Sequence, residues 1–154
     1  MLTERLMAMA NQVEKGESVA DIGTDHGYLP MYLFKEGISP KVIMADISKG
    51  SLNKAKQNCR EMYPNEKFDF RLGYGLKVIK RGEVDDIVIA GMGGVLISDI
   101  LGKDMGKSKT FKKLILQPRT AQGRLRFWLI RKGFDIVEEQ LVREGRFICE
   151  IITA

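Results

Sequence analysis

The fold of this chain is decided by its last stretch, Phe134–Ala154, which reads FDIVEEQLVREGRFICEIITA. Two runs rich in β-branched and aromatic residues flank the dipeptide Glu144-Gly145, and no helical pattern lies between them. A glycine between two such runs is typical of a tight hairpin turn. We therefore predict that the chain ends in an antiparallel pair of strands.

Upstream of this hairpin, short apolar runs alternate with segments of helical periodicity. Strands are predicted within residues 18–23, 41–47, 67–73, 85–92 and 113–118. Helices are predicted within residues 2–13, 28–37, 48–64, 75–82, 94–102 and 120–133. Because alternation at this spacing requires a mostly parallel sheet, the predicted fold is α/β and Rossmann-like, with seven strands and a C-terminal antiparallel hairpin.

The terminal hairpin separates two classes of nucleotide-binding fold. A nicotinamide-binding domain usually ends its sheet with parallel strands. Five crossovers followed by a hairpin resemble instead the strand order of S-adenosylmethionine-dependent methyltransferases. A nicotinamide-dependent oxidoreductase is therefore disfavoured.

Composition is that of an ordinary globular protein, with 44% hydrophobic and 29% charged residues among 154. We expect a single domain over residues 1–154. No apolar run approaches the length of a membrane span, and the first residues lack the apolar core of a signal peptide. We therefore expect a cytoplasmic protein without a membrane partner. Cys59 and Cys149 have no metal-site spacing, so we expect reduced thiols and no metal.

The first predicted strand runs into the loop DIGTDHG, residues 21–27. Gly23 would let the chain turn, and Gly27 would let the backbone approach a ligand. Asp21, at the strand end, could accept hydrogen bonds from loop amides or from a ligand ammonium. Asp25 and His26 stand where a dinucleotide fingerprint has small residues, so the loop is either a modified nucleotide site or a simple turn.

Asp46 ends the second predicted strand, followed by Ile47. It lies roughly 20 residues beyond the glycine loop, the interval typical of an acid that pairs with ribose hydroxyls. One carboxylate suits two adjacent hydroxyls, since both can donate to it. The alternative is that Asp46 caps the helix that begins near Lys49.

Glycines gather after the third and fourth predicted strands. Tyr74 lies between Gly73 and Gly75, and its ring could stack on adenine or lie across the pocket. The fourth strand ends in residues with little or no side chain, among them Ala90, Gly91, Met92 and Gly93. This backbone could lie against a flat or bulky ligand, or the glycines could only allow close packing of the helix that follows.

Basic residues are concentrated after the fifth predicted strand. The formal net charge is +5, and the excess lies mainly after Gly102. The loop at the end of this strand forms a rim of the sheet and leads into the next predicted helix. The candidate substrate-binding residues on this rim and helix are Gln117, Pro118, Arg119, Arg124 and Arg126. Arginines in this arrangement could face phosphates, but an ordinary amphipathic helix would look the same.

Three motifs together resemble one family. They are ADIGTDHGYLP at 20–30, IAGMGG at 89–94 and LILQPR at 114–119, preceded by RLMAMANQV at 5–13. In this order they resemble the bacterial tRNA (adenine-22-N1)-methyltransferases over essentially the whole chain. The resemblance implies S-adenosyl-L-methionine as cofactor and tRNA as partner. The oligomeric state stays open.

The resemblance also implies residue roles. Asp21, Gly23 and Gly27 would shape the methionine side of the cofactor pocket, and Asp46 would bind the ribose. The LGYGL segment would flank the adenine, and AGMGG would separate cofactor from target base. Two departures stand out. Tyr74 stands where the family usually has an acid. Members of the family also usually continue into a C-terminal helical domain, which we expect to be absent here.

Methylation of adenine N1 needs alignment more than a strong base, because this nitrogen carries an in-plane lone pair. We expect Asp25 to accept from the adenine amino group and to stabilise growing positive charge. His26 would stack on the target base or hydrogen-bond to it; the alternative is that it only holds the loop together. Tyr28 would form one side of the pocket. The alternatives are a cofactor-binding module without activity and a methyltransferase for small molecules.

Overall fold

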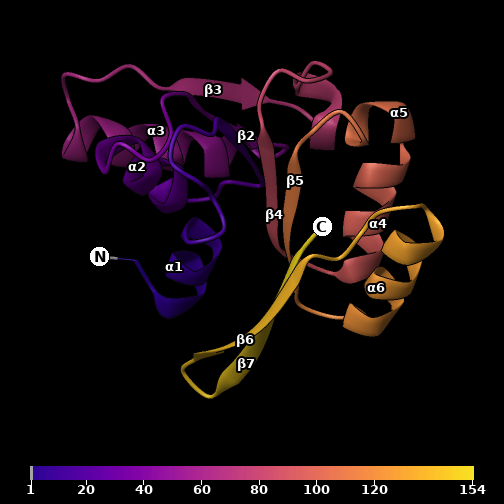
Figure 1. Ribbon diagram of the computed structural model, residues 1–154. Coiled ribbons are helices and arrows are strands. Elements are labelled where there is room, and N and C mark those ends of the chain that lie inside the picture. The colour runs from indigo at the N-terminus through magenta and orange to yellow at the C-terminus, as the bar shows by residue number, and fades with distance from the viewer. Residues whose placement is uncertain (1) are drawn as a thin grey trace.

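A computed structural model describes residues 2–154 as one seven-stranded sheet with helices on both faces (Figure 1). The strands are β1 (Val19–Ile22), β2 (Val42–Asp46), β3 (Asp69–Leu72), β4 (Asp86–Met92), β5 (Lys113–Pro118), β6 (Glu138–Glu144) and β7 (Phe147–Thr153). The helices are α1 (Glu4–Ala10), α2 (Tyr28–Lys35), α3 (Lys49–Met62), α4 (Gly94–Gly102), α5 (Met105–Ser108) and α6 (Gln122–Arg131), with a 3₁₀ turn, η1 (Gly75–Val78).

The strand order is β3-β2-β1-β4-β5-β7-β6. Strands β1 to β5 are parallel, whereas β7 is antiparallel to both β5 and β6. The predicted Rossmann-like sheet with its C-terminal hairpin is therefore confirmed. The order reverses between β1 and β4, which is where such sheets place their ligands.

Two predictions of local structure need correction. The helix predicted within 75–82 is only the single turn η1, Gly75–Val78, in which Gly75 and Leu76 are buried. The backbone is already extended at Ile79. Helix α5 was not predicted, since four residues are too few for an apolar period to show.

Side chains of the central strands alternate between two hydrophobic cores, one on each face of the sheet. Ile87 and Ile89 of β4 pack with α4 and α6 on one face of the sheet. Val88 between them packs with α1 and α2 on the other face. This burial on both faces explains why β4 is an almost unbroken apolar run. Among the described residues no helix is long and apolar enough to cross a membrane.

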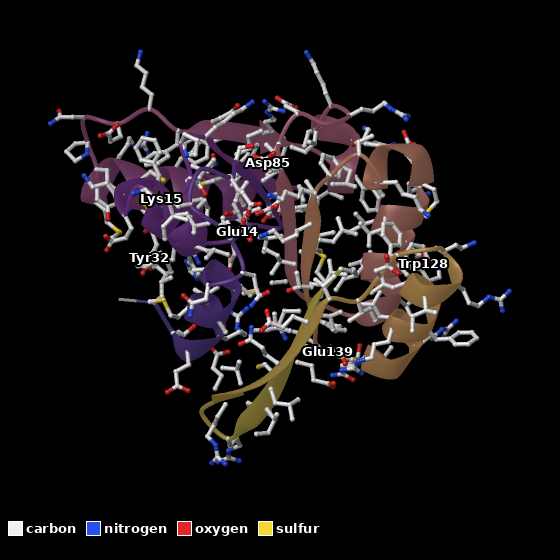
Figure 2. All side chains as sticks on the ribbon, viewed as in Figure 1. Glu14, Lys15, Tyr32, Asp85, Trp128 and Glu139 are labelled. Atoms are coloured by element: carbon white, nitrogen blue, oxygen red, sulfur yellow. The ribbon has the colours of Figure 1, made fainter. Side chains whose placement is uncertain are left out.

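Hairpin β6–β7 projects beyond the rest of the sheet, past α1 and α6 (Figure 1). Two sets of ion pairs attach it to the body. Arg126 of α6 bonds to Glu139 and Glu150, and Figure 2 shows Glu139 between the hairpin and α6. On the other side, Arg5 Nε of α1 donates to Glu144 Oε2 at 3.0 Å.

Candidate functional site

A cavity of about 320 Å³ opens at the carboxyl ends of β1, β2 and β4. It lies at the reversal of strand order, where the loops after adjacent strands diverge. Its lining comprises Arg5, Leu6, Met9, Asp21, Gly23, Thr24, Asp25, His26, Tyr28, Leu29, Asp46, Val88, Ala90, Gly91, Met92 and Arg119. The structure thus brings together most of the residues predicted from the first, second and fourth strand ends.

The loop after β1 is fixed by backbone bonds to β2. The amides of Gly23 and Thr24 both donate to the carbonyl of Ala45, at 2.9 and 3.0 Å. Gly23 and Gly27 have φ of +77° and +76°, values that other residues rarely adopt. The two glycines therefore let the chain leave the strand and begin α2 within one short loop.

Asp46 helps to hold the loop after β1 in place through its hydrogen bonds. Its carboxylate accepts from the amide of Asp25 at 3.3 Å and from the amide of Ser48 at 2.9 Å. Ser48, and not Asp46, caps helix α3, because its hydroxyl accepts from the amide of Ser51. The capping alternative is therefore wrong for Asp46. Ile47 is 66% exposed and lies outside the cavity lining.

Asp21 is buried at the back of the cavity. Its Oδ2 accepts from the Thr24 hydroxyl at 3.0 Å, and the described residues supply no donor to its other oxygen. Burial raises the pKa of Asp21 to about 7; the carboxylates of Asp46 and Asp25 add to the rise, while the Thr24 bond and Arg5 oppose it. An ammonium group entering the cavity would find a carboxylate lacking a cationic partner.

We expect Asp21→Asn to stabilise the ligand-free protein at pH 8 by up to roughly 4 kcal/mol. The pKa of Asp21 is raised from 3.8 to about 7 by folding, so ionising it costs stability. This cost is absent below pH 4, where the carboxyl is protonated in both states, and complete above pH 7. Urea unfolding of both proteins at pH 4, 6 and 8 should show that the difference in their free energies of unfolding grows with pH. A difference that is the same at all three pH values would contradict a raised pKa of Asp21 in the folded protein.

The three predicted catalytic residues lie together at the cavity. Asp25 has φ of +54°, a left-handed conformation that aspartate tolerates better than most residues. Its Oδ2 lies 3.4 Å from His26 Nε2. The His26 ring stacks on Tyr28 with centroids 5.3 Å apart, and the His26 carbonyl accepts from Asn58 Nδ2 at 3.0 Å. A carboxylate and an aromatic face therefore stand side by side.

The glycines after β4 divide between two roles. Ala90, Gly91 and Met92 line the cavity, and Gly91 has φ of +73° at a shift in register with β5. Gly93 lies outside the lining and precedes α4. A Cβ on Gly94 would meet the carbonyl oxygen of Ala121 at 2.7 Å, so close packing explains this last glycine.

The segment after β3 does not reach the cavity. Gly73, Tyr74 and Gly75 are missing from its lining. Tyr74 instead lines a separate hollow together with Ser98 of α4 and Trp128 of α6, and it packs against the core. The reason is local, since Tyr74 directly precedes η1, whose buried Leu76 draws the segment toward this core. The contact of Tyr74 with the ligand therefore stays a prediction, with its residue outside the lining of this cavity.

The predicted basic rim needs two corrections. Gln117 is only 3% exposed and does not project from the rim; its Oε1 accepts from Arg5 Nη1 and from the Gly91 amide, at 3.2 and 3.0 Å. Arg126 is engaged by Glu139 and Glu150. Arg119 lines the cavity, and Arg124 is exposed. Neither Arg119 nor Arg124 has a salt-bridge partner in residues 2–154.

Pro118 lies outside this cavity, in a neighbouring hollow that also contains Arg119. Sequence reasoning missed the contribution of α1, which supplies Arg5, Leu6 and Met9 to the lining. A lone arginine in the otherwise apolar stretch RLMAMA was the available signal. No group of histidine, cysteine and carboxylate side chains suited to a metal ion occurs among the described residues.

One family model, described as a methyltransferase domain, matches residues 2–152. The chain belongs to this family. Curated relatives of the methyltransferase domain include the tRNA (adenine(22)-N(1))-methyltransferase of Bacillus subtilis strain 168. It is 36% identical over 99% of this chain and 64% of its own length. The resemblance expected from the three motifs is thereby confirmed.

Solved structures agree with this assignment. Sp1610 of Streptococcus pneumoniae in complex with S-adenosyl-L-methionine is 36% identical, with a TM-score of 0.93 over 99% of this chain and 72% of that one. TrmK of M. capricolum in complex with S-adenosyl-homocysteine is 29% identical, with a TM-score of 0.88 over 99% of this chain and 68% of that one. The chain spans 64% to 68% of the curated relatives it matches.

Proposed function

We propose that this protein transfers a methyl group from S-adenosyl-L-methionine to N1 of the adenine at position 22 of tRNA. The observation that carries the proposal is the loop Asp21–Tyr28, which folds around a cavity beside Asp46 and presents Asp25, His26 and Tyr28 at it. The relatives named for this reaction share the whole length of the methyltransferase domain.

The residues present suit such a cofactor. Asp21 offers a buried carboxylate oxygen with no donor among the described side chains, which would accept from the amino group of the methionine part. Asp46 offers a carboxylate at the end of β2, where two ribose hydroxyls could donate to it. When bound, the cofactor supplies an electrophilic methyl group on a positively charged sulfur.

The chain's own residues would orient the target base. Adenine N1 forms the new bond to carbon as the carbon–sulfur bond breaks, and positive charge moves to the base, with no proton released in this step. Asp25 would accept from the exocyclic amine and stabilise that charge. The stacked rings of His26 and Tyr28 would hold the base plane and exclude water. Since N1 is a pairing edge, the base must be unpaired to enter.

Charge supports tRNA as the substrate. The net charge of the chain is +5. Arg119 lines both the cavity and the neighbouring hollow, where its guanidinium group could bind a phosphate of the RNA. Arg124 extends the positive surface along α6. An RNA substrate of this kind would place the protein in the cytoplasm.

The test is transfer of label from S-adenosyl-L-methionine to an unmodified tRNA with adenine at position 22. The control is the same tRNA with that base replaced. We expect label in the first RNA only. Binding of S-adenosyl-homocysteine without any transfer would favour a binding module, and label in small molecules alone would favour the other alternative. If NAD raised the melting temperature of the protein and S-adenosyl-homocysteine did not, the assignment of S-adenosyl-L-methionine as cofactor would be contradicted.

A further inference from the structure

A second hollow, here called the hairpin groove, lies next to the cavity and has a volume of about 450 Å³. Its lining includes Arg5, Arg119, Phe147, Ile148 and Cys149. The groove exists because β7 pairs with β5 only near its end, at Ile115 with Thr153 and Leu116 with Ile152. Residues 147–149 extend beyond that pairing, so one edge of β7 faces the loop after β5 without a partner strand.

The hairpin groove and the cavity are adjacent, because Arg5 and Arg119 line both. Arg5 is fixed between them by its bonds to Glu144 at 3.0 Å and to Gln117 at 3.2 Å. Arg119 has no ion-pair partner in the described part of the chain. A chain of phosphates entering the cavity would therefore pass a free guanidinium group at the boundary of the groove.

The outer wall of the hairpin groove is apolar and exposed. Phe147 is 69% exposed and Ile148 is 57% exposed. The Phe147 ring forms none of the aromatic or cation–π pairs found in residues 2–154. Arg146 precedes it at the turn and is exposed, and the residue paired with Phe147 across the hairpin is Glu144, which is bound by Arg5. An open aromatic face among cations is the usual platform for an unstacked nucleobase.

We propose that the hairpin groove receives the nucleotide adjacent to the target adenine, with its base stacked on Phe147. This inference rests on the proposed function, because it assumes an RNA substrate. When the target base leaves its stack to enter the cavity, its neighbour loses a stacking partner, and the Phe147 ring replaces that partner. The nearby Arg119 and Arg146 and the lining shared with the cavity favour RNA over an apolar protein segment.

The decisive variant is Phe147→Ala, compared with Leu141→Ala. Leu141 is 73% exposed on the same hairpin but lies outside the groove, so it matches the loss of exposed apolar surface. Phe147→Ala should raise KM for tRNA at least tenfold, while the Kd for S-adenosyl-homocysteine stays unchanged. Leu141→Ala should leave both values within twofold of the parent protein.

Cys149 provides a second readout that needs no turnover. It lines the groove and is partly exposed, whereas burial raises the pKa of the only other thiol, Cys59, to about 11. N-ethylmaleimide should therefore label Cys149 selectively in the folded protein. Unmodified tRNA should slow this labelling in the parent protein and in Leu141→Ala, but much less in Phe147→Ala.

The outcomes separate the two proposals. Equal KM values for Phe147→Ala and Leu141→Ala, with normal transfer by the parent protein, would overturn the groove proposal and leave the proposed function standing. Absence of transfer to any tRNA would contradict the proposed function. In that case tRNA protection of Cys149 that depends on Phe147 supports the groove as an RNA site, and absence of protection overturns it.

Discussion

Asp25→Asn is expected to lower kcat for methyl transfer at least a hundredfold, with the Kd for S-adenosyl-homocysteine within threefold of the parent value. Asparagine tolerates the left-handed backbone that Asp25 adopts, with φ of +54°, so the loop should keep its shape. What disappears is the negative charge beside His26, which would stabilise positive charge growing on the base. Single-turnover transfer and calorimetric binding measure the two quantities separately.

Asp25→Gly is the matched control, because glycine also accepts positive φ but leaves no acceptor at all. If the side chain only holds the loop, Asn should act like the parent protein and Gly should lose binding and turnover together. If Asp25 belongs to the cofactor pocket, both variants should lose affinity for S-adenosyl-homocysteine as much as they lose rate. Either pattern would remove Asp25 from the transfer step.

The sheet and much of the cavity could be predicted because they depend on local patterns. Apolar strands alternating with helices define the order of a parallel sheet, and glycines after strands mark where the backbone turns. Asp46 was found by its interval from the glycine loop. Each of these signals is contained within a stretch of about thirty residues, the length of a βαβ unit.

What could not be predicted depends on contacts between distant segments. Arg5 bonds to Glu144, which lies 139 residues away, and this contact brings α1 and the hairpin to the site. Gln117 is a polar residue at a strand end, but those same contacts bury it. Tyr74 turns to the core because η1 directs it there. A sequence pattern shows which residues are polar, whereas burial and direction are settled by packing.

Asp46→Ala is expected to weaken S-adenosyl-homocysteine binding at least a hundredfold. The carboxylate would accept from two ribose hydroxyls, and it also accepts from the amides of Asp25 and Ser48. Removing it takes away the ligand's acceptors and loosens the loop that shapes the cavity. Calorimetry measures the affinity, and urea unfolding measures the stability, which should fall by roughly 1–2 kcal/mol.

A ligand lacking the ribose 2′-hydroxyl separates these two contributions. On the parent protein, 2′-deoxy S-adenosyl-homocysteine should bind at least tenfold more weakly than the natural compound, because one donor to Asp46 is missing. On Asp46→Ala the two ligands should bind equally, since neither finds the carboxylate. A deoxy penalty that persists in the variant would mean that another group holds the ribose and that Asp46 acts only by fixing the loop. The coupling between variant and ligand therefore measures the direct contact, free of the loop's own contribution.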